Sequence, residues 1–599
     1  MKITPTTLSL SQLFSSSNEL FTIPAYQRRY SWQWKQLIEL FDDINYLKTQ
    51  DTHLLGSIVC LTSSHTAGIN PLELVDGQQR VTSLSLFMKA LQVKFEELGK
   101  QEISNEINNY LFCKGIDRKL NNKILLGDLD NPDYIKIMSQ TDLEEVKNQD
   151  LLNAYKYLYE WINKLTDQDI DEIYYKFINN VLIIRLDVGE AKDAYKLFET
   201  INNRGLKLNS TDIIKNFLLG HASSISEETL SSVKENWKEL IINLDEIDTD
   251  KFFRQFMSGI RTYKVTDTYV IDEFKKYYFN YVQEAEELAE FEIYNEIKVE
   301  NSEEIEEEIV EELDIENSTT ENSNEISKIS IIDFSKNLKN MSHIYKQLLK
   351  RKSDNQEINR HLFNLQRIKS FPSYIFLLNL FSRDDIDDSA IISTLKVIET
   401  FMLRRHVCAY RTGELDNIFA KLINLESADI VNTIKIKLVK DFPDDQEFQE
   451  KFSEADFRRE INRAKYILEV LEYDLIKDKG EFVIQSGNAV HLEHIIPQTI
   501  DTKKSKKEFG NWAEYLGENS LEKHKEFVNK IGNFTLLAGT LNIIASNNPF
   551  HDKLSEYAKS NIQMTKNICN EFNDKDFTFE IVSERSKDIA QKAVTIWRL

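Results

Sequence analysis

Helical periodicity dominates this chain, and residues that interrupt helices are scarce. The 599 residues include only 17 Gly and 8 Pro, and the segments between them repeat apolar residues at mostly helical spacing. Short strand-like segments, such as HLLGSIVCL and VLIIRLDV, occur mainly before residue 220. A chain of this length exceeds what one hydrophobic core supports, so we expect an α+β protein, predominantly helical, with several domains.

Three regions are expected along the chain. Residues 1–220 mix short strands with helices and form an α/β domain, whereas residues 221–440 form a helical connecting region. Residues 441–599 combine a helical lead-in with a C-terminal domain whose core lies at 488–560. In the middle region, the segment 284–325 holds 18 Asp and Glu against the single Lys298, so most of the net charge of −24 is local. We interpret this segment as a solvated, flexible loop, and the alternative is an acidic mimic of DNA.

The amino-acid sequence shows neither a targeting signal nor a pair of closely spaced cysteines. The start of the chain has no basic segment followed by an apolar run, and no stretch has transmembrane length, so a cytoplasmic protein without a membrane partner is expected. The four cysteines are far apart and form no CxxC pair, which argues against a disulfide framework and a zinc ribbon. They are interpreted as thiols of the core.

The C-terminal region contains the groups that a metal-dependent nuclease needs. The segment HLEHIIPQ places His494 where a neutral imidazole can take a proton from water. Glu493 and Asn542 supply oxygen ligands for a hard cation such as Mg²⁺ or Mn²⁺. Neighbouring residues of a regular strand point to opposite faces, so Glu493 and His494 share one site only near a strand end, and Pro497 fits such an end.

Two features near this constellation stay open. His491 is three residues before His494, which rules out the HExxH spacing of zinc proteases, and it is interpreted equally well as a core histidine. The cluster KKSKK at 503–507 either grips a DNA backbone or forms a solvated loop.

The N-terminal region contains a second constellation, around Asp76-Gly77-Gln78-Gln79-Arg80. It follows the apolar LELV and precedes an expected helix, so it surrounds a helix N-terminus that attracts anions, and Arg80 suits a phosphate. Neither a P-loop nor a GxGxxG motif is present. Upstream, IPAYQRRYSW interleaves aromatic and guanidinium groups, which suits either stacking on a base or a buried aromatic wall.

These motifs together resemble a known family. IPAYQRRYSW, LLGSIV, LVDGQQR and FETINNRGLKLNSTDIIKNFLL resemble the ParB-like, GmrS-type domain with its DGQQR signature. HLEHIIPQ, GNFTLL and LNIIASNNPFHDK resemble the GmrD-like branch of the HNH, or His-Me finger, endonucleases. The domain order resembles the GmrSD-type, modification-dependent (type IV) restriction endonucleases. The middle region is covered loosely, through FMLRRHVCAY.

The resemblance implies a fold and a set of site residues. It implies a ParB-like α/β N-terminal domain and a C-terminal ββα-metal nuclease domain. His494 falls on the general base and Asn533 on the catalytic-centre asparagine that braces the finger, with Glu493 and Asn542 as metal ligands. Other HNH branches more often carry Asp at the first of these positions. Asn547 and Lys553 match positions that contact DNA phosphate. The resemblance also implies a nucleotide site at Asp76, Gly77, Gln78, Gln79 and Arg80, with Tyr26, Gln27, Arg28 and Tyr30 either lining it or reading modified DNA.

The second block of the N-terminal resemblance has no role that the residues themselves reveal. Asn202, Asn203, Arg204 and Gly205 belong to it. Asp212 and Lys215 follow and are expected to cap and pair within the next helix.

The expected function is a nucleotide-regulated, metal-dependent endonuclease that cuts modified phage DNA in bacterial defence. Its cofactors would be Mg²⁺ or Mn²⁺ and a nucleoside triphosphate, GTP or ATP, which the N-terminal domain would hydrolyse. The alternative is a nucleotide-binding sensor with an inactive nuclease module, motivated by Glu493 in place of Asp and by the negative charge. Cleavage of RNA ranks below both. The oligomeric state stays open, a homo-oligomer included.

Overall fold

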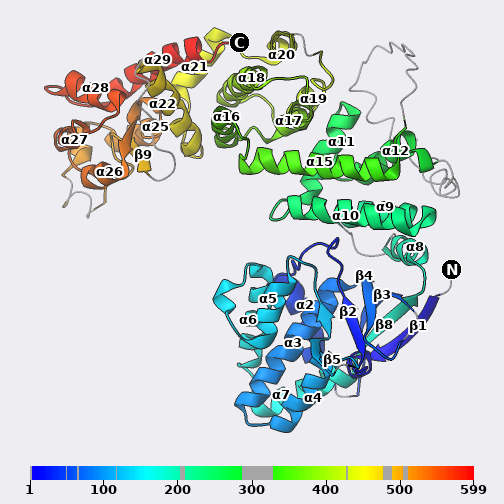
Figure 1. Cartoon of the computed structure of the whole chain (residues 1–599). Helices are drawn as coiled ribbons and strands as arrows, with labels where there is room; N and C mark the ends of the chain where they lie inside the picture. The colour runs from blue at the N-terminus through cyan, green and yellow to red at the C-terminus, as the bar shows by residue number, and fades with distance from the viewer. Residues whose placement is uncertain are drawn as a thin grey trace. The chain divides into compact units, whose positions relative to one another are not determined.

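The computed structural model describes residues 3–48, 50–63, 66–116, 118–202, 209–285, 328–426, 429–476, 489–502, 507 and 510–599. The chain forms two compact units, which are described separately below (Figure 1). The first comprises Met1–Phe253 and Thr266–His343, and the second comprises Arg254–Val265 and Ile344–Leu599. Helices predominate and a mixed sheet lies in the N-terminal region, as the α+β prediction requires.

A six-stranded mixed sheet organises the first unit. Its order is β1-β8-β3-β4-β2-β7, in which β8 runs antiparallel to β1 and parallel to β3. Strand β4 is antiparallel to β3 and parallel to β2. The strands are β1 (Ile3–Ser9), β2 (Glu19–Thr22), β3 (His53–Thr62), β4 (Asn70–Asp76), β7 (Ile124–Leu125) and β8 (Val181–Val188), and a separate hairpin pairs β5 (Phe112–Lys114) with β6 (Leu120–Asn122).

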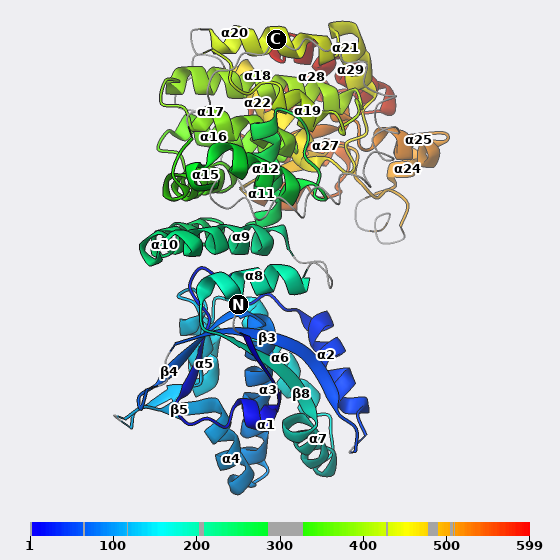
Figure 2. The ribbon, with the colours of Figure 1, turned by 90° about the vertical axis from the view of Figure 1, so that its right-hand side faces the viewer.

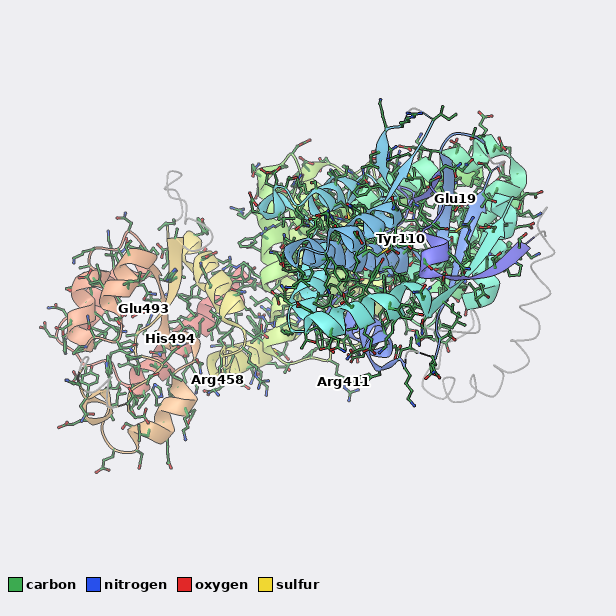
Figure 3. All side chains as sticks on the ribbon, turned by 90° about the horizontal axis from the view of Figure 1, so that it is seen from below. Glu19, Tyr110, Arg411, Arg458, Glu493 and His494 are labelled. Atoms are coloured by element: carbon green, nitrogen blue, oxygen red, sulfur yellow. The ribbon has the colours of Figure 1, made fainter. Side chains whose placement is uncertain are left out.

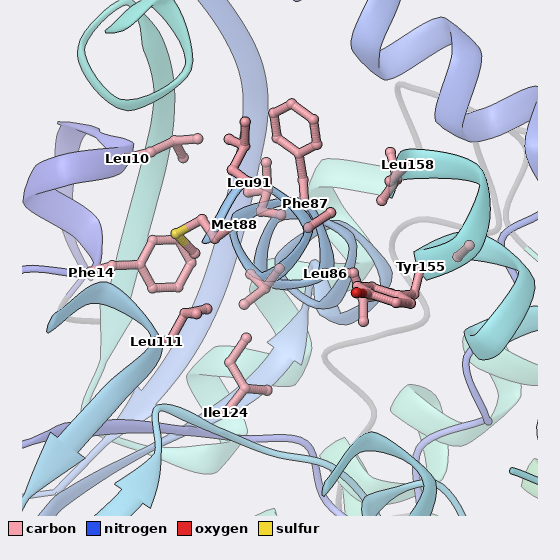
Figure 4. Packing of buried hydrophobic residues seen from close by; sticks show 14 of the residues in the cluster. Leu10, Phe14, Leu86, Phe87, Met88, Leu91, Leu111, Ile124, Tyr155 and Leu158 are labelled. Carbon is pink, nitrogen blue, oxygen red and sulfur yellow. The ribbon is translucent and has the colours of Figure 1, made fainter. Parts of the chain in front are cut away.

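One core of the first unit surrounds a central helix, α3 (Gln78–Glu97). Its side chains Leu86, Phe87, Met88 and Leu91 leave the helix in different directions and all are buried, as Figure 4 shows down the helix axis. A helix that is buried on all sides lies inside a core, and α3 also buries polar side chains such as Ser83, Ser85 and Gln92. The helices that share this core with α3 are α1 (Leu10–Leu13), α2 (Trp34–Tyr46), α4 (Gln101–Leu111), α5 (Asn131–Ser139), α6 (Gln149–Ile162) and α7 (Asp167–Asn179). The helices that instead pack against one another are α8 (Ala191–Asn202), α9 (Ser210–Ile225), α10 (Glu227–Asn243) and α12 (Val270–Tyr281).

In the described part of the second unit, the elements are helices apart from one strand pair, β9 (Val490–His494) with β10 (Phe534–Ala538). Figure 2 shows its helices from a second direction. Two helices, α11 (Thr249–Arg261) and α15 (Ile331–Lys350), contain the boundaries between the units. The rest are α16 (Gln356–Arg367), α17 (Tyr374–Phe381), α18 (Asp388–Val407), α19 (Leu415–Ala420), α20 (Ile430–Leu438), α21 (Asp445–Glu454), α22 (Ile461–Leu475), α24 (Trp512–Tyr515), α25 (Ser520–Phe527), α26 (Gly539–Ala545), α27 (Phe550–Tyr557), α28 (Gln563–Phe572) and α29 (Phe579–Ile596).

Several sequence expectations fall outside the described residues. These are the acidic segment from 286 to 325, most of KKSKK, the strand expected before residue 489, and Asn203, Arg204 and Gly205. Among the residues that are described, no helix is long and apolar enough to cross a membrane.

Candidate functional sites

The strand pair β9–β10 and the helix after it carry the C-terminal constellation. The strands are antiparallel, with His494 opposite Phe534 and Glu493 opposite Thr535. Helix α26 follows β10 directly and contributes Asn542. Because side chains alternate along a strand, His491 and Glu493 share one face of β9 and His494 lies on the other. Figure 3 labels Glu493 and His494 in the C-terminal part of the chain.

His494 is held at the end of β9 as a neutral base. Its ring meets Phe534 edge-on at 4.8 Å between ring centroids. Gln498 Nε2 lies 3.2 Å from Nε2 of the imidazole, and the Asn529 side chain also bonds to the ring. Burial lowers the pKa of His494 to about 4. An imidazole that is neutral at pH 7 can accept a proton, which is what a general base must do.

Asn533 braces the segment that follows β9. Its side chain is fully buried, accepts a hydrogen bond from the Ile496 amide at 2.8 Å and donates to the Ile496 carbonyl at 2.9 Å. It also donates to the Val528 carbonyl at 2.9 Å. With its donors and acceptor engaged by the backbone, Asn533 acts on the site by positioning the chain next to His494.

Glu493 is buried in an ion pair. Its Oε1 accepts hydrogen bonds from Lys553 Nζ at 2.7 Å and from Tyr557 Oη at 2.9 Å, both on α27. Burial raises the pKa of the Glu493 carboxyl and lowers that of the Lys553 ammonium. Lys553 donates in addition to the carbonyls of His494 at 2.8 Å and Ile495 at 3.2 Å. Its three donors are thus taken, and a DNA phosphate would reach it only by displacing one of these partners.

Asn542 lies beside His491. Its Nδ2 is 3.4 Å from His491 Nδ1, and turning the amide over would place the oxygen there instead. The described residues contain no group of three or more His, Cys, Asp and Glu that could hold a metal ion. A hydrated Mg²⁺ or Mn²⁺ needs only one or two protein ligands, so Asn542 and His491 fit such an ion. Glu493 could join them through Oε1 only by giving up Lys553 and Tyr557. Asn547 accepts a hydrogen bond from Trp512 Nε1 through its backbone carbonyl at 2.9 Å.

In the first unit, the DGQQR segment connects β4 to α3 through a glycine that no other residue can replace without strain. Gly77 has φ +91°, and a Cβ there would lie 2.5 Å from Ile58 Cγ2 on β3. Gly77 therefore permits both the left-handed turn and the close approach of the strand.

Two glutamines attach the YQRRYS segment to this turn. Gln79 accepts a hydrogen bond from the Ser31 amide at 2.9 Å and donates to the Arg29 carbonyl at 3.1 Å. Gln27 donates to the carbonyls of Leu74 at 3.3 Å and Val75 at 3.2 Å. The two motifs, about fifty residues apart, thus form one structural unit.

Asp76 and Arg80 are half-buried beside the turn. Arg80 NH1 donates to the Ser57 carbonyl at 2.8 Å. Burial raises the pKa of the Asp76 carboxyl, which the neighbouring Arg80 opposes, and it lowers the pKa of the Arg80 guanidinium. In this conformation Arg80 serves the β3–β4–α3 junction.

The hydroxyls of Tyr26 and Tyr30 are both engaged within the protein. Tyr26 bonds to Glu73 and lies 3.1 Å from the Tyr195 hydroxyl, and Tyr30 lies 2.7 Å from Ser83 Oγ. Both rings are buried.

Asp212 and Lys215 attach helix α9 to the YQRRYS segment, a role that the sequence interpretation missed. The buried Lys215 ammonium contacts Gln27 Oε1 and lies 3.2 Å from Asp212, while Arg28 Nε lies 3.2 Å from the other Asp212 oxygen. The N-cap of α9 is Asn209, not Asp212. The available signal was a charged pair inside the otherwise apolar DIIKNFLL, since such groups are buried only when they are paired.

A small cleft lies beside this cluster. Its cavity volume is about 20 Å³, room for about one water molecule. A nucleoside triphosphate would enter only if the surrounding side chains moved. Of the expected nucleotide residues, those that line the cleft are Gln27, Arg28, Tyr30, Gln78 and Gln79.

Comparison with protein-family models agrees with this arrangement. Residues 10–219 match the model of the GmrSD restriction endonuclease N-terminal domain, and residues 442–592 match the model of the GmrSD restriction endonuclease C-terminal domain. A comparison with curated proteins gives no match. The two models cover more than half of the chain and define it as a restriction endonuclease, for which DNA is the partner. The chain belongs to the GmrSD restriction endonuclease family.

Proposed function

We propose that this protein is an HNH-type, divalent-metal-dependent DNA endonuclease, regulated by a nucleoside triphosphate, that cuts modified phage DNA in bacterial defence. The observation that carries the proposal is His494, kept neutral by burial at the end of β9, with Asn542 on the helix that follows β10. That combination would supply a base for water and a ligand for the ion on two elements, β9 and α26, that contact each other.

The chemistry assigned to the chain's own residues is limited. His494 takes a proton from the water that attacks the phosphodiester phosphorus, and Gln498 and Asn529 orient its ring. Asn533 keeps His494 in place through the backbone of Ile496. His491 and Asn542 would hold the divalent ion, which when bound stabilises negative charge on the departing oxygen.

A cleavage assay tests this assignment. Plasmid containing ordinary, cytosine-modified or phosphorothioate DNA is incubated with the wild type and with His494→Ala, with and without Mg²⁺ and with GTP, ATP or no nucleotide. We expect the wild type to cut one of the modified substrates and His494→Ala to be slower by at least about 100-fold, the scale of a lost general base. The matched control is His343→Ala, because His343 is exposed and belongs to the first unit. Equal rates for the wild type and His494→Ala would discard the nuclease assignment.

The nucleotide is assigned to the cleft beside the DGQQR turn. Arg28 lines that cleft and is the most exposed of the motif's cations, with 37% of its side chain accessible. We expect Arg28→Ala to lower phosphate release from GTP or ATP at least about tenfold, as expected for loss of a charge-assisted contact to phosphate. The exposed Arg118 provides a control, Arg118→Ala, with the same change of charge. If the two variants release phosphate equally fast, the nucleotide site lies elsewhere.

One observation favours a second candidate, a nucleotide-binding sensor whose nuclease module is inactive. Lys553 neutralises Glu493, so the carboxylate expected to bind metal is already paired. Calorimetric titration with Mn²⁺ separates the two candidates. If the module is an active nuclease, Asn542→Ala should lower the affinity for Mn²⁺ at least tenfold. If the module is inactive, the wild type and Asn542→Ala should give the same titration.

A further inference from the structure

A wide cleft in the second unit lies outside both sites described above. It is lined by residues of α16, α18, α20 and α22, by the end of α15 and by the chain after α29. Its volume is about 1890 Å³, well beyond the several hundred to about 1,000 Å³ of ordinary small-molecule pockets. The size indicates an extended ligand.

The lining is strongly basic, although the protein as a whole is acidic. Eight lysine and arginine side chains line the cleft, against the three carboxylates Asp354, Glu399 and Glu469. Glu399 is already bonded to His361 at 2.6 Å and to Tyr466 at 2.9 Å. Glu469 pairs with Arg367, and Glu357, outside the lining, pairs with Arg360 and Lys396. Cations still exceed carboxylates in the lining. In a chain of net charge −24, this concentration of positive charge marks a place for a polyanion.

Arg367 presents an unused donor to the cleft. Its side chain is 8% exposed, and its guanidinium lies 5.3 Å from the centroid of the Phe363 ring and 5.7 Å from that of Tyr466. NH1 pairs with Glu469, but NH2 is buried and has no hydrogen-bond partner among the described residues. A buried guanidinium that is fixed in orientation and short of one acceptor suits a phosphate oxygen.

The aromatic residues of the cleft do not favour base recognition. Tyr466 and Trp597 are buried and bonded to each other, Trp597 Nε1 donating to the Tyr466 hydroxyl at 3.1 Å. Neither ring is free to stack on a base. Of the other two aromatic rings in the lining, Phe363 lies under the Arg351 and Arg367 guanidiniums, at 4.8 and 5.3 Å, and Tyr473 is half-buried. Charge is therefore the main feature by which the cleft would recognise a ligand, which is how proteins position nucleic acid without reading its sequence.

Helix α22 links the cleft to the nuclease motif. Tyr466, Glu469 and Tyr473 on this helix line the cleft, and the same helix contacts β9 and β10. Both features belong to the second unit, so a strand bound in the cleft and the β9 site share one rigid element.

We propose that this cleft binds the sugar-phosphate backbone of the DNA on which the enzyme acts. The inference rests on the proposed endonuclease function. It means that the helical connecting region helps to hold DNA and is more than a spacer between the two family domains.

The test uses three cations of the cleft that can be removed without disturbing the core. Lys352 and Arg598 are exposed and Lys435 is half-buried. The full-length variant Lys352→Ala/Lys435→Ala/Arg598→Ala is compared with Lys575→Ala/Lys587→Ala/Lys592→Ala, three exposed lysines of the same unit outside the cleft. Both variants lose the same charge. Binding of a fluorescent 30-base-pair duplex is measured in EDTA, where no cutting occurs, over a range of salt concentrations.

We expect the cleft variant to bind the duplex at least tenfold more weakly than the wild type and the control variant to stay within about twofold. The slope of log affinity against log salt should fall by roughly 2 to 3, about 0.9 for each lost phosphate contact. Equal binding and equal slopes for the two variants would overturn the proposal. Cleft-dependent binding of free ATP without any effect on the duplex would also overturn it, by identifying a nucleotide site.

Failure of this proposal is distinguishable from failure of the proposed function. If the wild type binds the duplex through the cleft but never cuts it, the cleft proposal holds and the nuclease assignment fails. If the wild type cuts DNA, and the wild type and the cleft variant bind the duplex with equal affinity, the nuclease assignment holds and the cleft proposal fails.

Discussion

At the scale of residues, the motifs identify which side chains gather, whereas the fold determines what each one faces. The sequence places Glu493 beside His494, but it cannot show that Lys553, 60 positions later, forms an ion pair with Glu493. It likewise identifies Asp212 and Lys215 without showing that they reach Gln27 and Arg28. Contacts between segments far apart depend on the path of the chain, which no local spacing encodes. The roles assigned to the site residues remain predictions.

Removing only one partner of the ion pair between Lys553 and Glu493 should destabilise the folded protein strongly. Lys553→Met leaves a buried carboxylate without its partner and should lower the free energy of unfolding by about 3–5 kcal/mol. The double variant Lys553→Met/Glu493→Gln removes the charge as well and should recover most of that loss. Urea unfolding followed by tryptophan fluorescence measures both. A single variant as stable as the wild type would show that the pair contributes little.

Gly77 gives a second residue-scale prediction with a close control. Gly77→Ala combines an unfavourable left-handed conformation with a Cβ 2.5 Å from Ile58 Cγ2, and should cost about 2–4 kcal/mol. Gly99 also has positive φ, +71°, but nothing lies within 4 Å of its Cβ position, so Gly99→Ala should cost about 1 kcal/mol. Urea unfolding of the two variants separates the effect of contact from that of conformation. Equal costs would mean that β3 moves aside without penalty.

At the scale of elements, periodicity predicted strands and helices wherever the pattern was local. The helix expected after DGQQR begins at Gln78, and VLIIRLDV forms β8. Helix α3 shows the limit of this approach, since burial on every side leaves no amphipathic pattern to reveal what packs against it. Arg404, in the loosely matched FMLRRHVCAY, is another example. It is fully buried and donates to the carbonyls of Trp597 and Val594, so it connects α18 with the end of α29.

Helix α9 carries a histidine that should make stability depend on pH. Burial lowers the pKa of His221 to about 3, with a smaller contribution from Lys275, against 6.5 for a free histidine. As the pH falls below 6.5, the unfolded chain binds this proton and the folded chain does not. Stability is therefore complete above about pH 6.5 and decreases toward the folded pKa.

The variant His221→Gln isolates this contribution. The free energy of unfolding of this variant should be lower than that of the wild type at pH 7. The difference should become smaller by roughly 2–3 kcal/mol between pH 7 and pH 4.5, since each pKa unit corresponds to about 1.4 kcal/mol. His551→Gln serves as the control, because half of that side chain is exposed. Urea unfolding at the two pH values provides the comparison. A difference that stays constant with pH would mean that His221 is protonated equally in both states.

At the scale of the whole molecule, the chain consists of two units with separate hydrophobic cores. One core surrounds α3 and contains Phe87, and the other packs β10, α26 and α27 together around Phe550. The composition indicated more than one domain, because one core cannot serve 599 residues. It did not indicate that the boundaries fall inside α11 and α15, because a helix that crosses a boundary shows the same periodicity as any other.

Separate cores imply separate unfolding transitions, and two of the variants above identify which transition belongs to which unit. Thermal unfolding of the intact protein should show two cooperative steps. Gly77→Ala disturbs the first unit and Lys553→Met the second, so each should lower the midpoint of a different step and leave the other nearly unchanged. Each unit exceeds 250 residues, for which 1 kcal/mol corresponds to about 2 °C, so shifts of several degrees are expected. If both variants shift the same step, the shared helices α11 and α15 couple the units into one cooperative system, and the two cores do not unfold independently.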